Sequence, residues 1–361
     1  MTALGVLDEH PFSLGLFGMT VSGGISMTDL DGVFGLSWQA TRDLARQADA
    51  AGLDLLVPVA RWRGYGGRLN PNGESYETFT WAAGIAAVTS RVVVAATAHA
   101  PAIHPLVAAK QSVTVDAISG GRFALNAVMG WFRTELDMFG VPTLEHHDRY
   151  RFGDEWMGVI DRLWSSPEPF DHNGAAFQLT GAVSLPRPPR RPLVLNAGAS
   201  PAGIEFSARH ADVNFATILS VEQSRDLVSS IHAAVREQGR RVRVMTYGTV
   251  VVGDTEADAR ARYQEILDHG DLEAARNFMH HVGLNSASFD AQIAAALDEH
   301  FISSGGGYPV VGTAEQVADE LAAMHAAGLE GFLMGGVPYD GMLARFEAEV
   351  MPKLRERGLR R

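Results

Sequence analysis

Cysteine is missing from this chain of 361 residues, and so is any long run of apolar residues. Without cysteine there are no disulfides and no thiolate metal sites. This composition fits a reducing compartment, so we expect a cytoplasmic protein. No apolar run reaches the length that crosses a membrane, and residues 1–11 lack the apolar core of a signal peptide. We therefore expect no membrane partner.

Positive charge is also scarce. The 30 Lys and Arg residues are outnumbered by 42 Asp and Glu residues, which leaves a net charge of −12. The basic stretch at residues 353–361 is interrupted by Glu356 and is typical of a solvated helix end. A chain with this charge and no uninterrupted basic cluster is not expected to bind nucleic acid.

Several catalytic signatures are absent as well. No Gly-x-Ser-x-Gly elbow points to a serine hydrolase, and no Gly-x-Gly-x-x-Gly fingerprint follows a predicted strand. His99, His104, His146 and His147 raise the question of a metal site. No pair of histidines four residues apart shares a predicted helix with a carboxylate, so we expect no metal. A role for His99 or His104 as a proton donor stays open.

What the sequence does contain is a regular alternation of apolar runs and helical spacing. Hydrophobic content of 46% and charged content of 20% are ordinary for a globular enzyme. Eight strand–helix pairs predict a (β/α)8 TIM barrel in a single domain over residues 1–361. The predicted strands lie at 14–17, 53–59, 92–96, 123–125, 193–195, 213–215, 242–252 and 331–334. The predicted helices lie at 37–51, 74–89, 105–119, 149–164, 201–210, 222–238, 256–269, 314–327 and 339–357.

Two segments fall outside this alternation. Residues 167–185 predict an extra hairpin around His172-Asn173-Gly174. Residues 271–311 form a long insertion that ends in Ser303-Ser304-Gly305-Gly306-Gly307. A long insertion near a barrel mouth predicts a lid over the site.

Polar residues follow two neighbouring predicted strands. Asn126 comes directly after the run Phe123–Leu125, and Thr97 and His99 follow the preceding strand. In a parallel barrel, side chains at the carboxyl ends of strands point into the mouth where catalysis occurs. Thr97 and Asn126 are therefore the candidate catalytic residues. The alternative for Asn126 is an asparagine that only caps the following turn.

A phosphate site is predicted after the fifth strand. Gly198 allows close approach of the backbone, Ser200 is a good N-cap and Pro201 a good first helical residue. Free N–H groups at such a helix start suit a phosphate. Arg149 and Tyr150, which open the helix after strand four, could complete the site as donors. An ordinary capped helix is the alternative.

These residues occur in blocks that resemble the bacterial luciferase-like flavin monooxygenases. Within that family the chain looks closest to the dimethylsulfone and the pyrimidine (uracil) monooxygenases. The resemblance covers roughly residues 12–220 and the last fifty or so. Its marks are Val21-Ser22-Gly23-Gly24, Arg63-Gly64-Tyr65-Gly66-Gly67, Ser119-Gly120-Gly121-Arg122, Asn126 with Gly130-Trp131-Phe132-Arg133, Glu145-His146 with Asp148-Arg149-Tyr150-Arg151, and the turn at residues 198–200.

The resemblance implies a cofactor, a partner and a reaction. The cofactor is FMN, used as FMNH2 with O2, and a separate NAD(P)H:flavin reductase supplies it. The reaction oxidises a small organosulfur or N-heterocyclic substrate and cleaves a C–S or C–N bond. The stretch Phe17-Gly18-Met19-Thr20 departs from the sulfone enzymes, which puts sulfone specificity in doubt. Family members often form homodimers or homotetramers.

The resemblance also assigns site residues. Thr97 and Asn126 would hold dioxygen beside the flavin, where hydroxyl and amide donors stabilise developing charge. The cofactor contacts would be Ala60, Arg61, Asn126, Glu135, Arg149, Tyr150 and Ser200, with Gly198 in the same turn as Ser200. Two alternatives remain on the same barrel: a deazaflavin-dependent oxidoreductase that transfers hydride without oxygen, and a non-catalytic flavin-binding relative.

Overall fold

Eight parallel strands close into a barrel in a computed structural model that describes residues 3–142, 144–284 and 291–361. The barrel strands are β1 (Ser13–Phe17), β2 (Leu55–Val57), β3 (Val93–His99), β4 (Phe123–Val128), β7 (Leu193–Asn196), β8 (Val213–Phe215), β9 (Arg243–Gly253) and β11 (Gly331–Gly335). β11 pairs with β1, and β9 pairs with both β8 and β11, so the ring is complete. The predicted TIM barrel is confirmed.

The strands are nearly all apolar because both of their faces are buried. One face of each strand fills the barrel interior with residues such as Leu55, Val93 and Met245. The alternate residues, such as Leu56 and Val94, pack outward against the helices in the largest hydrophobic cluster. The barrel therefore has a packed interior, and an open site can form only where the strands end.

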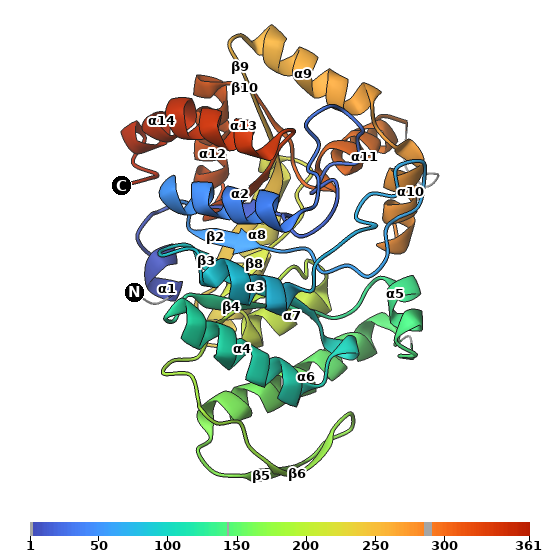
Figure 1. The fold of residues 1–361 in the computed structure, drawn as a ribbon, viewed down its shortest axis with the longest axis vertical. Helices are drawn as coiled ribbons and strands as arrows, with labels where there is room; N and C mark the ends of the chain where they lie inside the picture. The colour runs from blue at the N-terminus through green and yellow to red at the C-terminus, as the bar shows by residue number, and fades with distance from the viewer. Residues whose placement is uncertain (1–2, 143, 285–290) are drawn as a thin grey trace.

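Helices surround the barrel (Figure 1). Those that follow strands are α2 (Trp38–Ala50), α3 (Thr78–Ala86), α4 (Pro105–Ser119), α6 (His146–Ser165), α7 (Pro201–His210), α8 (Val221–Glu237), α9 (Glu256–Asp268), α12 (Ala314–Ala326), α13 (Tyr339–Arg345) and α14 (Met351–Glu356). Several begin where the sequence offers a cap: Ser37, Ser200 and Ser220 each accept a hydrogen bond from a backbone N–H group of the first turn.

The structure differs from the sequence-based elements in several places. β9 continues past the barrel and pairs through residues 250–253 with an additional strand, β10 (Val310–Thr313). This strand was missed because it lies at the end of the predicted insertion, outside the strand–helix alternation. The predicted helix at 339–357 is divided by a π-helical segment, Phe346–Val350. α6 starts three residues earlier than predicted, and α3 is shorter than predicted at both ends. The short helices α1 (Ala3–Leu7), η1 (Ala100–Ala102) and α5 (Arg133–Met138) were not predicted.

Two segments outside the barrel were expected. The predicted hairpin is confirmed as the antiparallel pair β5 (Phe170–Asn173) and β6 (Gln178–Ala182), which projects at the bottom of Figure 1. The insertion contains α10 (Leu272–His281), α11 (Ala291–Ser304) and the start of β10, while residues 285–290 lie outside the described residues. Its role as a lid stays a prediction. Within the described ranges, no helix has both the length and the apolar character needed to cross a bilayer.

Both chain ends lie on the left of Figure 1, whereas α5 and α10 lie on the right. Residues that follow β4 and residues of α10 line a cavity at the barrel mouth, so this mouth lies on the side of α5 and α10.

Candidate active site

A cavity of about 600 Å³ occupies the carboxyl ends of the barrel strands. Its size is within the range of small-molecule and cofactor pockets. None of the described residues that line it is acidic, although the chain as a whole carries a net charge of −12. Among the described lining residues, Arg61 and Arg149 are the only Lys or Arg side chains. The cavity therefore favours a ligand that carries negative charge.

Thr97 and Asn126 face the same cavity from neighbouring strands. They are paired in the register of β3 and β4, and the Asn126 side-chain NH2 donates to the Thr97 hydroxyl at 3.0 Å. The Thr97 hydroxyl in turn donates to the carbonyl of Pro58 at 2.5 Å. Asn126 Oδ1 is buried and has no partner among the described residues. Asn126 thus keeps free hydrogen-bonding capacity, while Thr97 fixes its orientation.

Arg61 lines the cavity, and Glu135 lies behind it. The Arg61 guanidinium donates to the carbonyl of Ala60 at 2.8 Å and to the hydroxyl of Tyr65 at 2.9 Å, and it lies 3.3 Å from a Glu135 oxygen. Glu135 is fully buried and also accepts the N–H of Trp62 at 2.8 Å. Glu135 is not among the residues that line the cavity, and it holds the loop after β2. Its contact with a cofactor stays a prediction.

The opposite end of the cavity is built by the first turn of α6 and the turn before α7. Arg149, Tyr150 and Gly198 line it. Arg149 donates to the carbonyl of Gly130 at 3.0 Å, and its Nε is buried without a partner in the described structure. Burial raises the pKa of Tyr150, and a hydrogen bond with Ser200 acts in the opposite direction.

Ser200 has the predicted capping role. Its hydroxyl accepts the N–H of Gly203 at 3.2 Å, and the residue itself is not on the cavity wall. The N–H of Gly198 donates to Asn196 Oδ1, so it is not available to an anion. In the described part of the chain the N–H groups of Ala199, Ser200 and Ala202 make no backbone or capping hydrogen bond. These N–H groups are the ones that remain available to an anion.

Comparison with known proteins identifies this arrangement. A family model described as luciferase-like monooxygenase matches residues 15–331. The chain belongs to this family. The FMNH2-dependent dimethylsulfone monooxygenase of Pseudomonas putida is 28% identical over 356 residues, which cover 96% of each chain. The pyrimidine monooxygenase RutA of Acinetobacter baylyi is 31% identical over 82% of each chain.

A solved structure supports the same fold. Riboflavin lyase (RcaE), crystallised with modified FMN and riboflavin, superimposes with a TM-score of 0.87 at 23% identity. The match covers 97% of this chain and 92% of the lyase. The predictions of family, barrel and monooxygenase class are therefore confirmed. The alternative of a non-catalytic flavin-binding relative is not supported.

The histidines of this luciferase-like monooxygenase have separate environments. His99 of β3 lines the cavity but is largely buried, and this burial and then the charge of Arg61 lower its pKa to about 3, so it is neutral near pH 7. His104 is exposed and its ring accepts the N–H of Leu106 at the start of α4. His146 lines the cavity, whereas the His147 side chain is 79% exposed. Among the residues described, no three His, Asp or Glu side chains gather as a metal site requires.

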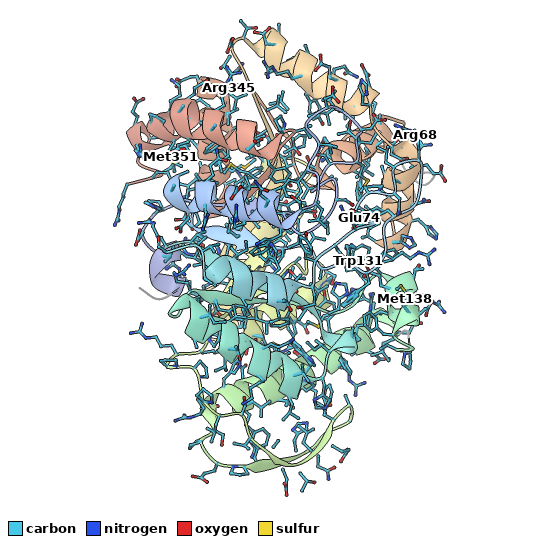
Figure 2. All side chains as sticks on the ribbon, in the orientation of Figure 1. Arg68, Glu74, Trp131, Met138, Arg345 and Met351 are labelled. Atoms are coloured by element: carbon cyan, nitrogen blue, oxygen red, sulfur yellow. The ribbon has the colours of Figure 1, made fainter. Side chains whose placement is uncertain are left out.

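Several cavity residues of this monooxygenase were not predicted from the sequence. Phe278 of α10 stacks on Tyr65 with ring centroids 4.3 Å apart and on Trp131 at 5.2 Å. Figure 2 shows Trp131 between α5 and α10 at the right of the molecule. Tyr247 of β9 donates to the carbonyl of Gly305 at 3.1 Å, and burial raises its pKa to about 12. No local motif marks Phe278 or Tyr247, because each reaches the cavity only through the tertiary fold.

Proposed function

We propose that this luciferase-like monooxygenase inserts oxygen into a small organosulfur or N-heterocyclic compound, with cleavage of a C–S or C–N bond. The predicted cofactor, FMNH2 with O2, is confirmed by relatives such as the FMNH2-dependent dimethylsulfone enzyme. The substrate class rests on the dimethylsulfone and pyrimidine relatives together. A separate NAD(P)H:flavin reductase would supply the reduced flavin, since no nicotinamide fingerprint is present in the sequence.

The residues of the cavity fit reduced FMN. Arg149, Tyr150 and the free N–H groups before and within the first turn of α7 would hold the phosphate. Asn126 Oδ1, buried without a partner, offers an acceptor for a ring N–H. When bound, the reduced flavin supplies the electrons that activate dioxygen. The observation that carries the proposal is this unpaired amide inside a cavity whose wall, where the structure describes it, has Arg149 and no acidic residue.

The chain's own residues would perform three tasks. Thr97 orients Asn126, so that its amide is fixed before the ligands arrive. Arg61, held by Glu135 and stacked over Trp131 at 4.6 Å, closes one wall. The apolar rings of Phe17, Phe215 and Phe278 limit the access of water. Ala60 also lines the cavity, and its contact with the cofactor belongs to the same proposal.

Stopped-flow mixing of the protein, FMNH2 and O2 with a panel of sulfones, sulfonates and cyclic amides tests the proposal. We expect one class to be oxidised with nearly one product per FMNH2. Asn126→Ala and Thr97→Val should keep binding of FMNH2 within about threefold, yet lower the yield of product per FMNH2 about tenfold or more, because charge on oxygen is no longer stabilised. Hydrogen peroxide should rise in proportion.

Ser112→Ala, a buried hydroxyl on α4 away from the cavity, is the matched control and should stay coupled. Full coupling in both site variants would refute the roles of Thr97 and Asn126. A protein that ignored FMNH2 but bound a deazaflavin tightly would instead support the deazaflavin-dependent alternative. Light scattering tests the proposed homodimer or homotetramer in the same preparations.

A further inference from the structure

Two asparagines and one serine form a buried cluster behind the turn that precedes α7. Asn196 and Asn214 are register partners on β7 and β8. Ser207 lies on the facing side of α7. Asn196 is 3% exposed, and Asn214 and Ser207 are fully buried. Burying three polar side chains between a strand pair and a helix is costly unless their hydrogen bonds are made.

The bonds of this cluster converge on one backbone residue, Gly198. Asn196 Oδ1 accepts the Gly198 N–H at 2.8 Å, and Asn214 Nδ2 donates to the Gly198 carbonyl at 2.9 Å. Ser207 links the two asparagines, since its hydroxyl donates to Asn196 at 3.0 Å and accepts from Asn214 at 2.9 Å. Both polar groups of Gly198 are therefore fixed by side chains rather than by strand or helix partners.

This arrangement determines which backbone groups face the cavity. A carbonyl oxygen turned toward a phosphate would repel it, and Asn214 keeps the Gly198 carbonyl bonded on the other side. Gly198 also packs tightly, because a Cβ there would lie 2.8 Å from the Tyr150 hydroxyl and 2.7 Å from the Cα of Gly203. The turn is thus locked against both Tyr150 and the start of α7.

The cost of the cluster indicates a purpose beyond packing. Asn214 Oδ1 is buried with no partner among the described residues. An apolar residue would avoid this penalty if the position served only the core. An asparagine at position 214 is explained if the two hydrogen bonds that it donates, to Gly198 and to Ser207, are needed to hold the turn.

We propose that Asn196, Ser207 and Asn214 are positioning residues that hold the turn at Gly198 so that α7 and Tyr150 receive a phosphate, and that they set the preference for FMN over riboflavin. The inference rests on the proposed function, because it presumes that FMN binds in this cavity. It assigns no contact between the cluster and the cofactor.

The test compares the affinities for reduced FMN and reduced riboflavin under anaerobic conditions. The ratio of the two dissociation constants isolates the phosphate contribution. Asn214→Leu should reduce the preference for FMN about tenfold, because the turn at Gly198 no longer holds the hydrogen-bond donors around the phosphate. Riboflavin has no phosphate, so its affinity should change less than about twofold. Ser207→Ala, a milder change, should reduce it about threefold. Thr246→Val, which removes another buried strand hydroxyl that bonds to a carbonyl, is the matched control and should keep the wild-type ratio.

The outcomes are distinct. A wild-type preference that persists in folded Asn214→Leu and Ser207→Ala would overturn the inference and leave the proposed function intact. An equal loss of affinity for FMN and for riboflavin would also overturn the inference, since the cluster would then affect the whole pocket. A wild-type protein that binds riboflavin as tightly as FMN would overturn the phosphate site of the proposed function itself. Thermal unfolding of each variant verifies that the compared proteins are folded. If Asn214→Leu does not fold, the result for Ser207→Ala decides the test.

Discussion

The side chains at the barrel mouth differ in how many of their hydrogen-bonding groups already have a partner. The Thr97 hydroxyl is occupied by Pro58 and Asn126, whereas Asn126 keeps an unpaired oxygen. The variants Thr97→Val and Asn126→Ala are therefore not equivalent. Loss of Thr97 releases Asn126 from its orientation, and loss of Asn126 removes the whole amide, including the Nδ2 hydrogen that is not donated to Thr97. We expect the coupling defect to be the larger in Asn126→Ala.

His99 provides a prediction about pH. Burial and Arg61 lower its pKa from 6.5 to about 3, so the unfolded chain binds a proton that the folded chain does not between these pH values. Stability should therefore fall as pH drops through this window, by at most about 1.4 kcal/mol per pH unit from this group. Urea unfolding at pH 6.5 and pH 4.5 should show that wild type loses about 2 kcal/mol more than His99→Gln.

His10, whose pKa is also lowered to about 4, titrates in the same range in both proteins and cancels in this difference. Equal acid losses in wild type and His99→Gln would show that His99 is protonated in the folded state. As a neutral group near pH 7, His99 is a poor candidate for the proton donor considered from the sequence.

At the level of elements, α10 is attached to the barrel mouth by stacked rings. Tyr65 comes from the loop after β2, Trp131 from the loop after β4 and Phe278 from α10. Aromatic pairs of this kind contribute about 0.5–1.5 kcal/mol each beyond their buried area. Three segments that are distant in sequence are thus joined over the cavity.

Phe278→Ala should weaken this attachment and speed the escape of the cofactor. We expect the dissociation rate of FMNH2 to increase about tenfold, because the ring contacts of α10 with Tyr65 and Trp131 are lost. A stopped-flow chase with excess competing flavin measures it. Leu272→Ala, an exposed position on the same helix, is the control and should keep the wild-type rate. A rate for Phe278→Ala within twofold of wild type would mean that α10 does not retain the cofactor.

At the scale of the whole molecule, an ion pair and hydrogen bonds of Arg360 connect chain segments at the end of the barrel opposite the mouth. Arg360 forms an ion pair with Asp54, which is fully buried, and donates to the carbonyls of Gly52 at 2.7 Å and Phe12 at 3.1 Å. Asp54 also accepts the N–H of Leu14 in β1 at 2.8 Å. The last residues of the sequence therefore connect the segments that begin the first two barrel strands.

Arg360→Met should destabilise the fold by about 3–5 kcal/mol, since it leaves a buried carboxylate without its partner. Urea unfolding measures the loss. The double variant Arg360→Met/Asp54→Asn should recover much of it, because the unpaired charge is gone. Arg361→Met, at an exposed side chain, should stay within about 0.5 kcal/mol of wild type. A loss below about 1 kcal/mol in Arg360→Met would show that Asp54 is neutral in the fold.

Most of the fold could be predicted from the sequence because its signals are local. Apolar runs such as 193–195 and the Ser200-Pro201 cap each determine an element within a few residues. β10 could not be predicted, since it lies at the end of the insertion, outside the strand–helix alternation, and exists only by pairing with β9. The division of the last helix at 346–350 also has no signal in the sequence pattern.

The sequence by itself determined that the chain forms a barrel of the luciferase-like type and which strand ends carry Thr97 and Asn126. It did so because periodicity, caps and short ordered motifs are properties of neighbouring residues. The tertiary structure alone decided that Glu135 pairs with Arg61, that Phe278 lines the cavity, and that Asn196 and Asn214 form hydrogen bonds with Gly198. Each of these contacts joins residues from different strands or helices, and only closure of the barrel brings them within hydrogen-bond or van der Waals distance.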